Sequence, residues 1–290
     1  MTPLLKLLRP HQWVKNGFVL VGLLFGHAWS DGSKLSQALC AFAAFCLLSS
    51  AVYVFNDIQD RAADREHPQK RLRPLAAGTV SVQMATMLLG FCLAGGLTLA
   101  FGFAGQAPWV FVAYLAINLA YSLGAKHVVI LDVFIIAAGF MLRLLAGTLG
   151  LGIAPSQWLL LCGLMLTLFL GFAKRRAELS AVADDPAAHR RVLEDYSENL
   201  LDQLITVATA CAVISYSLYT VSADTVALHG SSHLILTVPF VLYGMFRYLF
   251  LLHRRGGGGD AASEVIADRH LITACLGWLA TVLAVLGGRL

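Results

Sequence analysis

Charged side chains are scarce in this sequence. Only 13% of the 290 residues are Asp, Glu, Lys or Arg, whereas 58% are hydrophobic. A soluble domain carries about a quarter charged residues, so the composition excludes an ordinary soluble globular protein. The length suits one bundle of about eight to ten membrane spans, without an added soluble domain. We therefore expect an all-α integral membrane protein with a single membrane-embedded domain over residues 1–290.

Cysteine motifs for metal or redox chemistry are also absent. The six cysteines stand singly in apolar stretches, with no Cys-x-x-Cys pair and no Cys/His group at zinc spacing. We expect all six to serve as small buried hydrophobic side chains. His229 and His233 are four residues apart in a polar connection that offers no carboxylate partner, so no metal site is expected there.

Nine apolar runs are long enough to cross a bilayer as helices. Gly and Pro separate several of them, and Ser81 is placed to cap the third run at its N-terminus. The sequence therefore predicts a nine-helix bundle with spans at about 17–34, 36–56, 82–103, 107–124, 127–151, 156–173, 199–221, 233–252 and 270–288.

Lysine and arginine are distributed very unevenly between the two sides of this bundle. With the N-terminus in the cytoplasm, all but four of the 21 basic residues fall in cytoplasmic segments. The four exceptions are Lys34 and Arg289 on the opposite side, and Arg143 and Arg247 within helices. Because short cytoplasmic loops are enriched in Lys and Arg, we predict a cytoplasmic N-terminus and polar loops that face the cytoplasm.

The most polar stretch of the chain runs from Asn56 to Pro74 and follows a long apolar run. At the end of a helix, Asp57, Asp60 and Asp64 would share one face, since they lie at i, i+3 and i+7. Three carboxylates on one face repel each other unless a cation lies between them, and Mg²⁺ prefers such oxygen ligands. The stretch ends in Lys70, Arg71 and Arg73, which suit anionic oxygens. The alternative is a solvated loop whose charges only set the topology.

Other charges lie at or within the predicted spans. Asp132 and Arg143 are three helical turns apart in the fifth span, and Arg143 suits either an anion-accepting cavity or a structural pair. Lys174 and Glu178 are four residues apart, as in a helix salt bridge, although Lys174 to Arg176 would also suit a phosphate.

The start of the first span has the same two interpretations. Arg9, Gln12, Lys15 and Asn16 could be snorkelling anchors or ligands, and Tyr121 and Lys126 close the fourth span on the same side. We expect these polar groups to converge on one cytoplasmic mouth. A carboxylate set for Mg²⁺ combined with many cations suits a diphosphate leaving group, and the helical bundle suits a lipid as the other reactant. A transporter is the non-enzymatic alternative, but its charges would lie near the middle of the membrane.

The segment N-D-x-x-D-x-x-x-D, Asn56 to Asp64, resembles the first aspartate motif of the UbiA superfamily of membrane prenyltransferases. This resemblance implies a nine-helix bundle that uses Mg²⁺ to bind and ionise a prenyl diphosphate. Family members normally carry a second aspartate-rich motif after a later span. Here the corresponding residues, 173–179, read A-K-R-R-A-E-L and are basic. A prenyl transfer to a small aromatic acceptor is the alternative function.

Within the superfamily, the sequence resembles a branch that transfers phosphoribose to polyprenyl phosphate. The matches are R-P-x-Q-W-x-K-N from Arg9, the whole run from Asn56 to Pro74, and weaker matches further on. The resemblance implies 5-phosphoribosyl 1-diphosphate (PRPP) as donor, a deca- or undecaprenyl phosphate as acceptor, and Mg²⁺ as cofactor. It assigns the metal and catalysis to Asp57, Asp60 and Asp64. It assigns substrate binding to Lys15, Asn16, Asn56, Lys70, Arg71, Tyr121, Lys126, Arg143, Lys174, Arg175 and Glu178.

The resemblance also implies a setting in the cell. The branch acts in the bacterial inner (plasma) membrane, and its product feeds arabinose-donor synthesis for the cell envelope. We expect a multi-pass protein whose active site faces the cytoplasm. No nucleic-acid partner is expected, and a homo-oligomer is an allowed arrangement.

Overall fold

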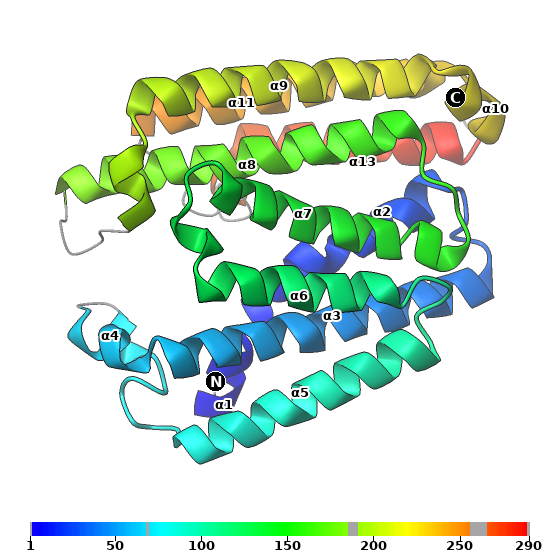
Figure 1. Cartoon of the computed structure of the whole chain (residues 1–290). Coiled ribbons are helices and arrows are strands. Elements are labelled where there is room, and N and C mark those ends of the chain that lie inside the picture. The colour runs from blue at the N-terminus through cyan, green and yellow to red at the C-terminus, as the bar shows by residue number, and fades with distance from the viewer. Residues whose placement is uncertain (1, 68–69, 185–190, 256–265, 289–290) are drawn as a thin grey trace. The chain divides into compact units, whose positions relative to one another are not determined.

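The structure is a computed structural model that describes residues 2–67, 70–184, 191–255 and 266–288. Regular structure in these ranges is helical (Figure 1). The chain splits into two compact units: Met1–Ala125 with Ala138–Pro155, and Lys126–Ala137 with Ser156–Leu290. The division falls inside helix α7 (Leu131–Ala146). The single domain over 1–290 stays a prediction.

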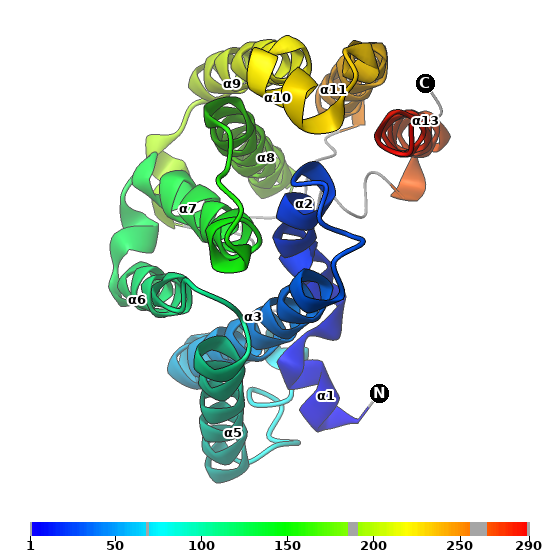
Figure 2. The same ribbon diagram turned by 90° about the vertical axis from the view of Figure 1, so that its right-hand side faces the viewer.

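Unit 1 is organised around the 28-residue helix α3 (Gly32–Gln59), against which α5 and α6 pack (Figure 2). Asp31 caps α3 by accepting hydrogen bonds from the amides of Ser33 and Lys34, which satisfies donors that a helix start leaves unpaired. The other elements of the unit are α1 (Pro3–Leu8), η1 (Pro10–Gly17), α2 (Phe18–Phe25), α4 (Arg61–Glu66), η2 (Lys70–Leu72), α5 (Val82–Gly102), α6 (Trp109–Leu123) and η4 (Leu149–Leu151).

The core of unit 1 lies between α3 and α6. The Phe45 ring packs against the rings of Phe111 and Tyr114, with centroids 4.6 and 5.3 Å apart. A second cluster joins Leu7 of α1, Val54 of α3 and the loop residue Leu75, all of them buried. This cluster fixes the end of α3 from which the polar stretch begins.

The first predicted span, 17–34, is wrong in its extent. Its helix, α2, has only eight residues and ends at Phe25. The chain then turns at His27, whose φ is +51°, and α3 starts at Gly32. A helix of eight residues spans about 12 Å, much less than the roughly 30 Å of a hydrocarbon core.

Unit 2 is built from long helices that pack side by side, α8 against α9 and α11 against both α9 and α13. Its core joins Phe169 and Phe172 of α8 with Leu201 and Ile205 of α9. Besides the first part of α7, the unit contains α8 (Gln157–Asp184), η6 (Arg191–Asp195), α9 (Glu198–Val221), α10 (Ala223–His229), η7 (His233–Thr237), α11 (Val238–Arg255) and α13 (Arg269–Leu286). The short η3 (Ala125–His127) begins in unit 1 at Ala125 and continues into this unit.

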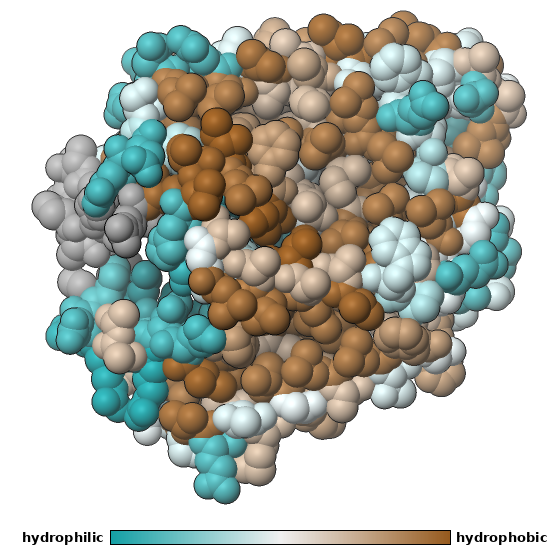
Figure 3. Space-filling model, in the orientation of Figure 1, coloured by the Kyte–Doolittle hydropathy of each residue, from teal (hydrophilic) through white to brown (hydrophobic). Residues whose placement is uncertain are grey.

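Seven helical segments in the described ranges are long and apolar enough to cross a membrane, and α6 is a shorter apolar helix of 15 residues. The protein is therefore a multi-pass helical membrane protein; the count of nine spans stays a prediction. Ser81 caps α5, as predicted, by accepting from the Met84 amide. In Figure 3, hydrophobic side chains cover the visible flank of α5 and α6, and hydrophilic ones gather around α4.

The cysteines are less uniform than the sequence predicts. Cys46 and Cys92 are buried, but Cys275 of α13 is exposed and the other three are partly exposed. The expectation of buried thiols is therefore confirmed for Cys46 and Cys92 and wrong for the other four. A helix that faces lipid can carry an apolar side chain on its outer surface, so an apolar sequence context does not require burial inside the protein.

Candidate active site

The predicted acidic face forms where α3 meets α4. The backbone hydrogen bonds from the Asp60 amide to Asn56 O and from the Asp64 amide to Asp60 O are both 2.8 Å, so the helical register continues across the junction. Residues seven apart in such a register share a face. Asp57 and Asp64 accordingly lie on one side, and both are buried, with relative exposures of 3% and 4%. Asp60, at the junction, is partly exposed.

An arginine joins the two buried carboxylates. Nη1 of Arg73 donates to Asp64 Oδ2 at 2.8 Å and to Asp57 Oδ1 at 3.2 Å. One nitrogen therefore contacts both side chains, in the place where two carboxylates need a cation to offset their repulsion. The sequence shows that Arg73 suits anionic oxygens, but it does not show that these oxygens are those of Asp57 and Asp64.

Arg9 neutralises the same site from the N-terminal side. Its Nη2 lies 2.6 Å from Asp57 Oδ1, and its guanidinium lies over the Tyr53 ring, 4.9 Å from the centroid. Arg9 has φ +51° and ψ +59°, a left-handed conformation that is unfavourable for a residue with a side chain. Pro10, which follows it, disfavours the right-handed helical alternative for Arg9. The turn between α1 and η1 therefore directs Arg9 to the carboxylates.

The loop after α4 folds back and brings Arg73 to the carboxylates. Leu75 is buried in the cluster with Val54, and two arginines of α4 hold the loop backbone: Arg61 Nε donates to Leu75 O and Arg65 Nε to Ala76 O. Arg61 and Arg65 therefore have a structural contact with the loop. Pro68 and Gln69 of the same stretch lie outside the described residues.

The paired carboxylates fit a divalent cation. Asp57 and Asp64 already share one cationic nitrogen, and carboxylate oxygens are the ligands that Mg²⁺ prefers. Over the described ranges, no group of three or more His, Cys, Asp or Glu side chains is placed to hold a metal ion. Mg²⁺ commonly takes only one or two protein carboxylates, with water and substrate phosphate completing its shell. A metal role for Asp60 stays a prediction.

Other predicted residues of unit 1 lie on α3, α6, η1 and η2. Asn56 accepts a 2.6 Å hydrogen bond from Ser122 Oγ, which links α3 to α6 one residue after Tyr121. Lys70 and Arg71 are exposed on η2, three and two residues before Arg73. Lys15 lies in η1, the element that follows Arg9. Substrate contacts stay predictions for Lys15, Asn56, Lys70, Arg71 and Tyr121.

Arg143 is buried in unit 1 among neutral groups. Its guanidinium donates to Asn16 Oδ1 at 2.7 Å, to Gly139 O at 2.8 Å and to the Tyr114 hydroxyl at 3.1 Å. The rings of Tyr114, Phe45 and Phe140 lie within 5.4 Å of its Cζ. Asn16 and Arg143, predicted separately, are thus in contact. Arg143 does not pair with Asp132, whose partner is Arg175.

In unit 2, Asp132 and Arg175 form a fully buried ion pair, with relative exposures of 0% and 1%. Arg175 Nε donates to Asp132 Oδ2 at 2.6 Å, and its Nη1 contacts Glu178 Oε2. Breaking a buried pair leaves a charge without compensation, so this pair holds α8 to the start of α7. The sequence left two interpretations for the basic segment 173–179, a helix salt bridge or a phosphate site. For Arg175 and Glu178 the structure shows ion pairing.

Tyr196 completes this pair and was not found by sequence analysis. Its hydroxyl donates to Asp132 Oδ1 at 2.9 Å and accepts from the Ile130 amide at 2.6 Å. Ile130 has φ +68°, which is strained for a β-branched residue. Burial raises the pKa of Tyr196 above its ordinary value, so the hydroxyl stays protonated and keeps donating. Tyr196 therefore fixes the turn that connects Lys126 to α7.

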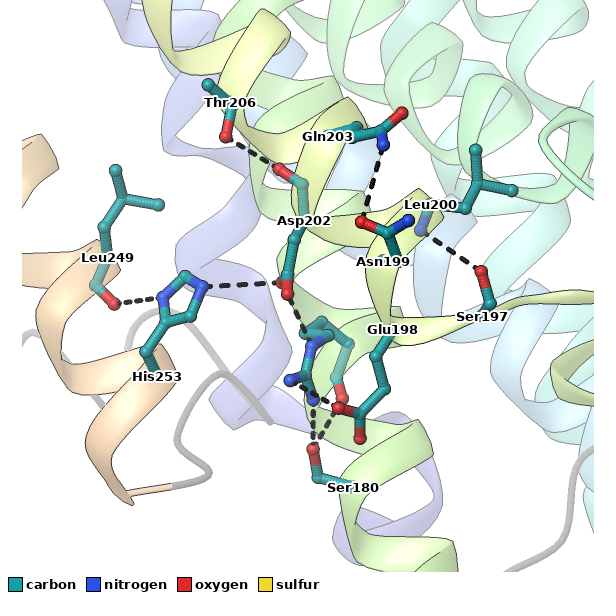
Figure 4. A network of polar contacts seen from close by, with 11 residues as sticks. Ser180, Ser197, Glu198, Asn199, Leu200, Asp202, Gln203, Thr206, Leu249 and His253 are labelled. Carbon is teal, nitrogen blue, oxygen red and sulfur yellow. Dashed lines mark hydrogen bonds and ion pairs between the residues drawn. The ribbon is translucent and has the colours of Figure 1, made fainter.

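Arg176 belongs to a surface network that joins α8 and α9. It contacts Glu198 and Asp202 of α9 at 2.9 and 3.1 Å, and Asp202 also lies 3.5 Å from His253 of α11 (Figure 4). The side chains of Arg175 and Arg176 are 1% and 15% exposed, against 45% for Lys174, whose Nζ is 4.0 Å from Glu178. Among these three cations, Lys174 is therefore the one most accessible to a dissolved anion.

These features define a multi-pass helical membrane protein with a buried, arginine-neutralised carboxylate pair at the end of a spanning helix. The model of the UbiA prenyltransferase family matches residues 17–272. The chain belongs to the UbiA prenyltransferase family, as its aspartate motif predicted.

Relatives with an assigned activity cover nearly the whole chain. A decaprenyl-phosphate phosphoribosyltransferase of Mycolicibacterium smegmatis is 33% identical, with 96% of this chain and 91% of that protein covered. The protein of the same name from Corynebacterium glutamicum is 35% identical over 95% and 84%. Among solved structures, a UbiA homolog from Archaeoglobus fulgidus bound to GPP and Mg²⁺ has a TM-score of 0.74 at 19% identity, covering 99% of this chain and all of that one. The UbiA fold is thereby confirmed.

Proposed function

We propose that this protein is a polyprenyl-phosphate phosphoribosyltransferase of the bacterial inner membrane. It would move 5-phosphoribose from PRPP to a deca- or undecaprenyl phosphate and release diphosphate. The relatives named above support this assignment because they match over almost their full length. The structural observation that carries it is the buried pair Asp57 and Asp64, neutralised by Arg9 and Arg73 beside the cationic segment η2.

The residues of unit 1 suit the donor's diphosphate. Asp57 and Asp64 would hold Mg²⁺, with Asp60 near the same junction. The metal would supply positive charge that stabilises the leaving diphosphate. Lys70 and Arg71 are exposed cations on the adjoining η2, and they would bind the diphosphate oxygens that the metal leaves free. Asn56, held by Ser122, would orient the donor at the same junction.

The reaction needs no proton transfer from the protein. The bond from C1 of the ribose to the diphosphate oxygen breaks, and the diphosphate leaves with the electron pair. An ionised phosphate oxygen of the lipid forms the new bond to C1 from the opposite face. Because that phosphate is ionised at neutral pH, a general base is not required. The carboxylates are therefore assigned to metal binding.

PRPP and the lipid carry phosphates besides the diphosphate, and the remaining predicted cations suit these. Lys15, Lys126 and Lys174 would bind the donor's 5-phosphate or the acceptor phosphate. The accessible position of Lys174 supports this role. Arg175 and Glu178 would position Lys174 through their ion pair, and Asn16 with Arg143 would stabilise α7 against η1.

The experiment uses the purified protein in detergent with PRPP, Mg²⁺ and decaprenyl phosphate. We expect diphosphate release and a phosphoribosylated lipid, both lost in EDTA. The second substrate pair is geranyl diphosphate with a small aromatic acceptor. Turnover of that pair alone would show a prenyltransferase and overturn the proposal.

A further inference from the structure

We propose that Arg73 is an internal cation that Mg²⁺ must displace from Asp57 and Asp64, and that the displaced guanidinium then binds the donor's diphosphate. This inference rests on the proposed function, in which these two carboxylates hold the metal. It adds a competition within the site and a second role for Arg73.

Arg73 already contacts both carboxylates that would hold the metal ion. Its Nη1 lies 2.8 Å from Asp64 Oδ2 and 3.2 Å from Asp57 Oδ1, so it already contacts one oxygen of each carboxylate. A divalent ion held by these two carboxylates would compete with Nη1 for their oxygens, so we expect the two cations to exclude each other.

The exposure of the three side chains makes an exchange feasible. The carboxylates are 3% and 5% exposed, whereas the Arg73 side chain is 31% exposed. Arg73 also lies in a loop that is held by its own backbone contacts: Arg61 and Arg65 donate to the carbonyls of Leu75 and Ala76. The guanidinium can leave the carboxylates while these contacts keep the loop in place.

The charges of the site give the exchange a direction. Asp57 and Asp64 carry two negative charges, and Arg9 and Arg73 balance them with two positive ones. A divalent ion that enters displaces a guanidinium and leaves an excess of positive charge. A diphosphate compensates that excess, and an arginine fork matches its oxygens. Metal and diphosphate binding should therefore assist each other, and such coupling is reciprocal.

The test measures Mn²⁺ binding by electron paramagnetic resonance, with no PRPP and no lipid present. The full-length protein in detergent is compared with Arg73→Gln and with the control Lys6→Gln. Lys6 is an exposed cation of α1, so the control removes an equal charge from the same unit and leaves the contacts of Arg61 and Arg65 with the loop unchanged. We expect Arg73→Gln to bind Mn²⁺ about tenfold more tightly than wild type, within the usual range of coupling between sites. Lys6→Gln should stay within about twofold of wild type.

A second measurement needs no variant. Phenylglyoxal modifies accessible guanidinium groups, and mass spectrometry of the peptides locates the product. In the wild-type protein, Mn²⁺ should increase the modification of Arg73 and leave that of Arg65 unchanged.

The results of these two measurements separate the exchange from the metal role of the carboxylates. Equal or weaker Mn²⁺ binding in Arg73→Gln, or a modification rate at Arg73 that ignores Mn²⁺, overturns the exchange and leaves the proposed function standing. Absence of Mn²⁺ binding in both wild type and Arg73→Gln overturns the metal role, and the exchange with it. If Arg73→Gln does not fold, the wild-type modification rate decides alone.

Discussion

Two carboxylates that repel each other are kept together by arginines from two separate segments. Asp57 and Asp64 are brought to one side by the helical register, while Arg9 and Arg73 arrive from a strained turn and from a folded loop. The two carboxylates, Arg9 and Arg73 thus depend on three different local structures. Single substitutions can therefore separate metal binding from the stability of the fold.

Replacement of Asp57 by asparagine should remove catalysis and leave a folded protein. Asparagine keeps the shape but loses the charge that holds a divalent ion, so we expect diphosphate release to fall by about 100-fold or more. Release is measured with PRPP, Mg²⁺ and decaprenyl phosphate, and folding by size-exclusion chromatography. Glu66→Gln, an exposed carboxylate on α4, is the control and should retain activity. Full activity of Asp57→Asn would contradict the metal role.

Replacement of Lys174 by alanine should weaken substrate binding. The side chain is 45% exposed, so its main loss would be a charge-assisted contact worth about 1.5–3 kcal/mol, equivalent to about a tenfold or greater rise in apparent KM. The rise is measured separately for PRPP and for the lipid phosphate. Lys34→Ala, at the N-terminal end of α3, serves as the control. Unchanged kinetics for both substrates would assign Lys174 to topology.

For individual residues, the sequence predicted the common face of Asp57 and Asp64 but not the arginine that pairs with them. The i and i+7 spacing is enough to place Asp57 and Asp64 on one face, because only helical geometry is involved. Arg73 reaches them through a loop whose path depends on the burial of Leu75. Such a path has no sequence period, so the pairing could not be predicted from spacing.

Close backbone contact between elements depends on glycine in unit 1. A Cβ at Gly22 of α2 would lie 1.9 Å from Gly147 O, and one at Gly147 would lie 1.8 Å from Val19 O. These contacts are with backbone atoms, which cannot rotate away. The short helix α2 therefore packs directly on the end of α7 within this unit.

Gly22→Ala should destabilise the protein by about 1–3 kcal/mol or more, the usual cost of overpacking. The change is measured as a lower midpoint of thermal unfolding in detergent. Gly32→Ala is a matched control, because nothing lies within 4 Å of a Cβ at that position. A midpoint equal to wild type for Gly22→Ala would show that α2 does not pack here.

Tyr196→Phe should loosen the turn before α7. It removes the hydroxyl that Asp132 and the strained Ile130 share, so we expect faster amide hydrogen exchange over residues 126–131. If Lys126 binds a phosphate, the apparent KM should rise more than kcat falls. Tyr243→Phe, on α11, is the control. Exchange that is unchanged in Tyr196→Phe would show that the turn holds without it.

The long helices could be predicted from apolar length, but the shorter ones could not. Runs such as 82–103 and 199–221 coincide closely with α5 and α9. The run 17–34 is apolar only as far as Gly26, and the helix ends at Phe25. The sequence at Gly26 and His27 permits a turn, and in the structure Ile153 packs close to Gly26, where the turn forms.

For the molecule as a whole, the distribution of Lys and Arg predicts a cytoplasmic N-terminus, and this can be measured on one helix. Glu66→Cys follows the C-terminal end of α3, and Lys34→Cys lies at its N-terminal end. In a cysteine-free background, an impermeant maleimide should label Glu66→Cys only in inverted membrane vesicles, which expose the cytoplasmic face. It should label Lys34→Cys only in intact cells, which expose the opposite face. The reverse pattern would invert the topology and move the carboxylate site to the opposite side.

Helix α7 gives the molecule an unusual connectivity. Its residues up to Ala137 pack in one compact unit and those from Ala138 in the other, without an intervening loop. Severing the peptide at this point would cut through hydrogen-bonded helix, so neither half should assemble when the two are produced as separate polypeptides. A break in the connection between α6 and η3, at Gly124, spares α7, and fragments divided there are the better choice for reconstitution by co-expression.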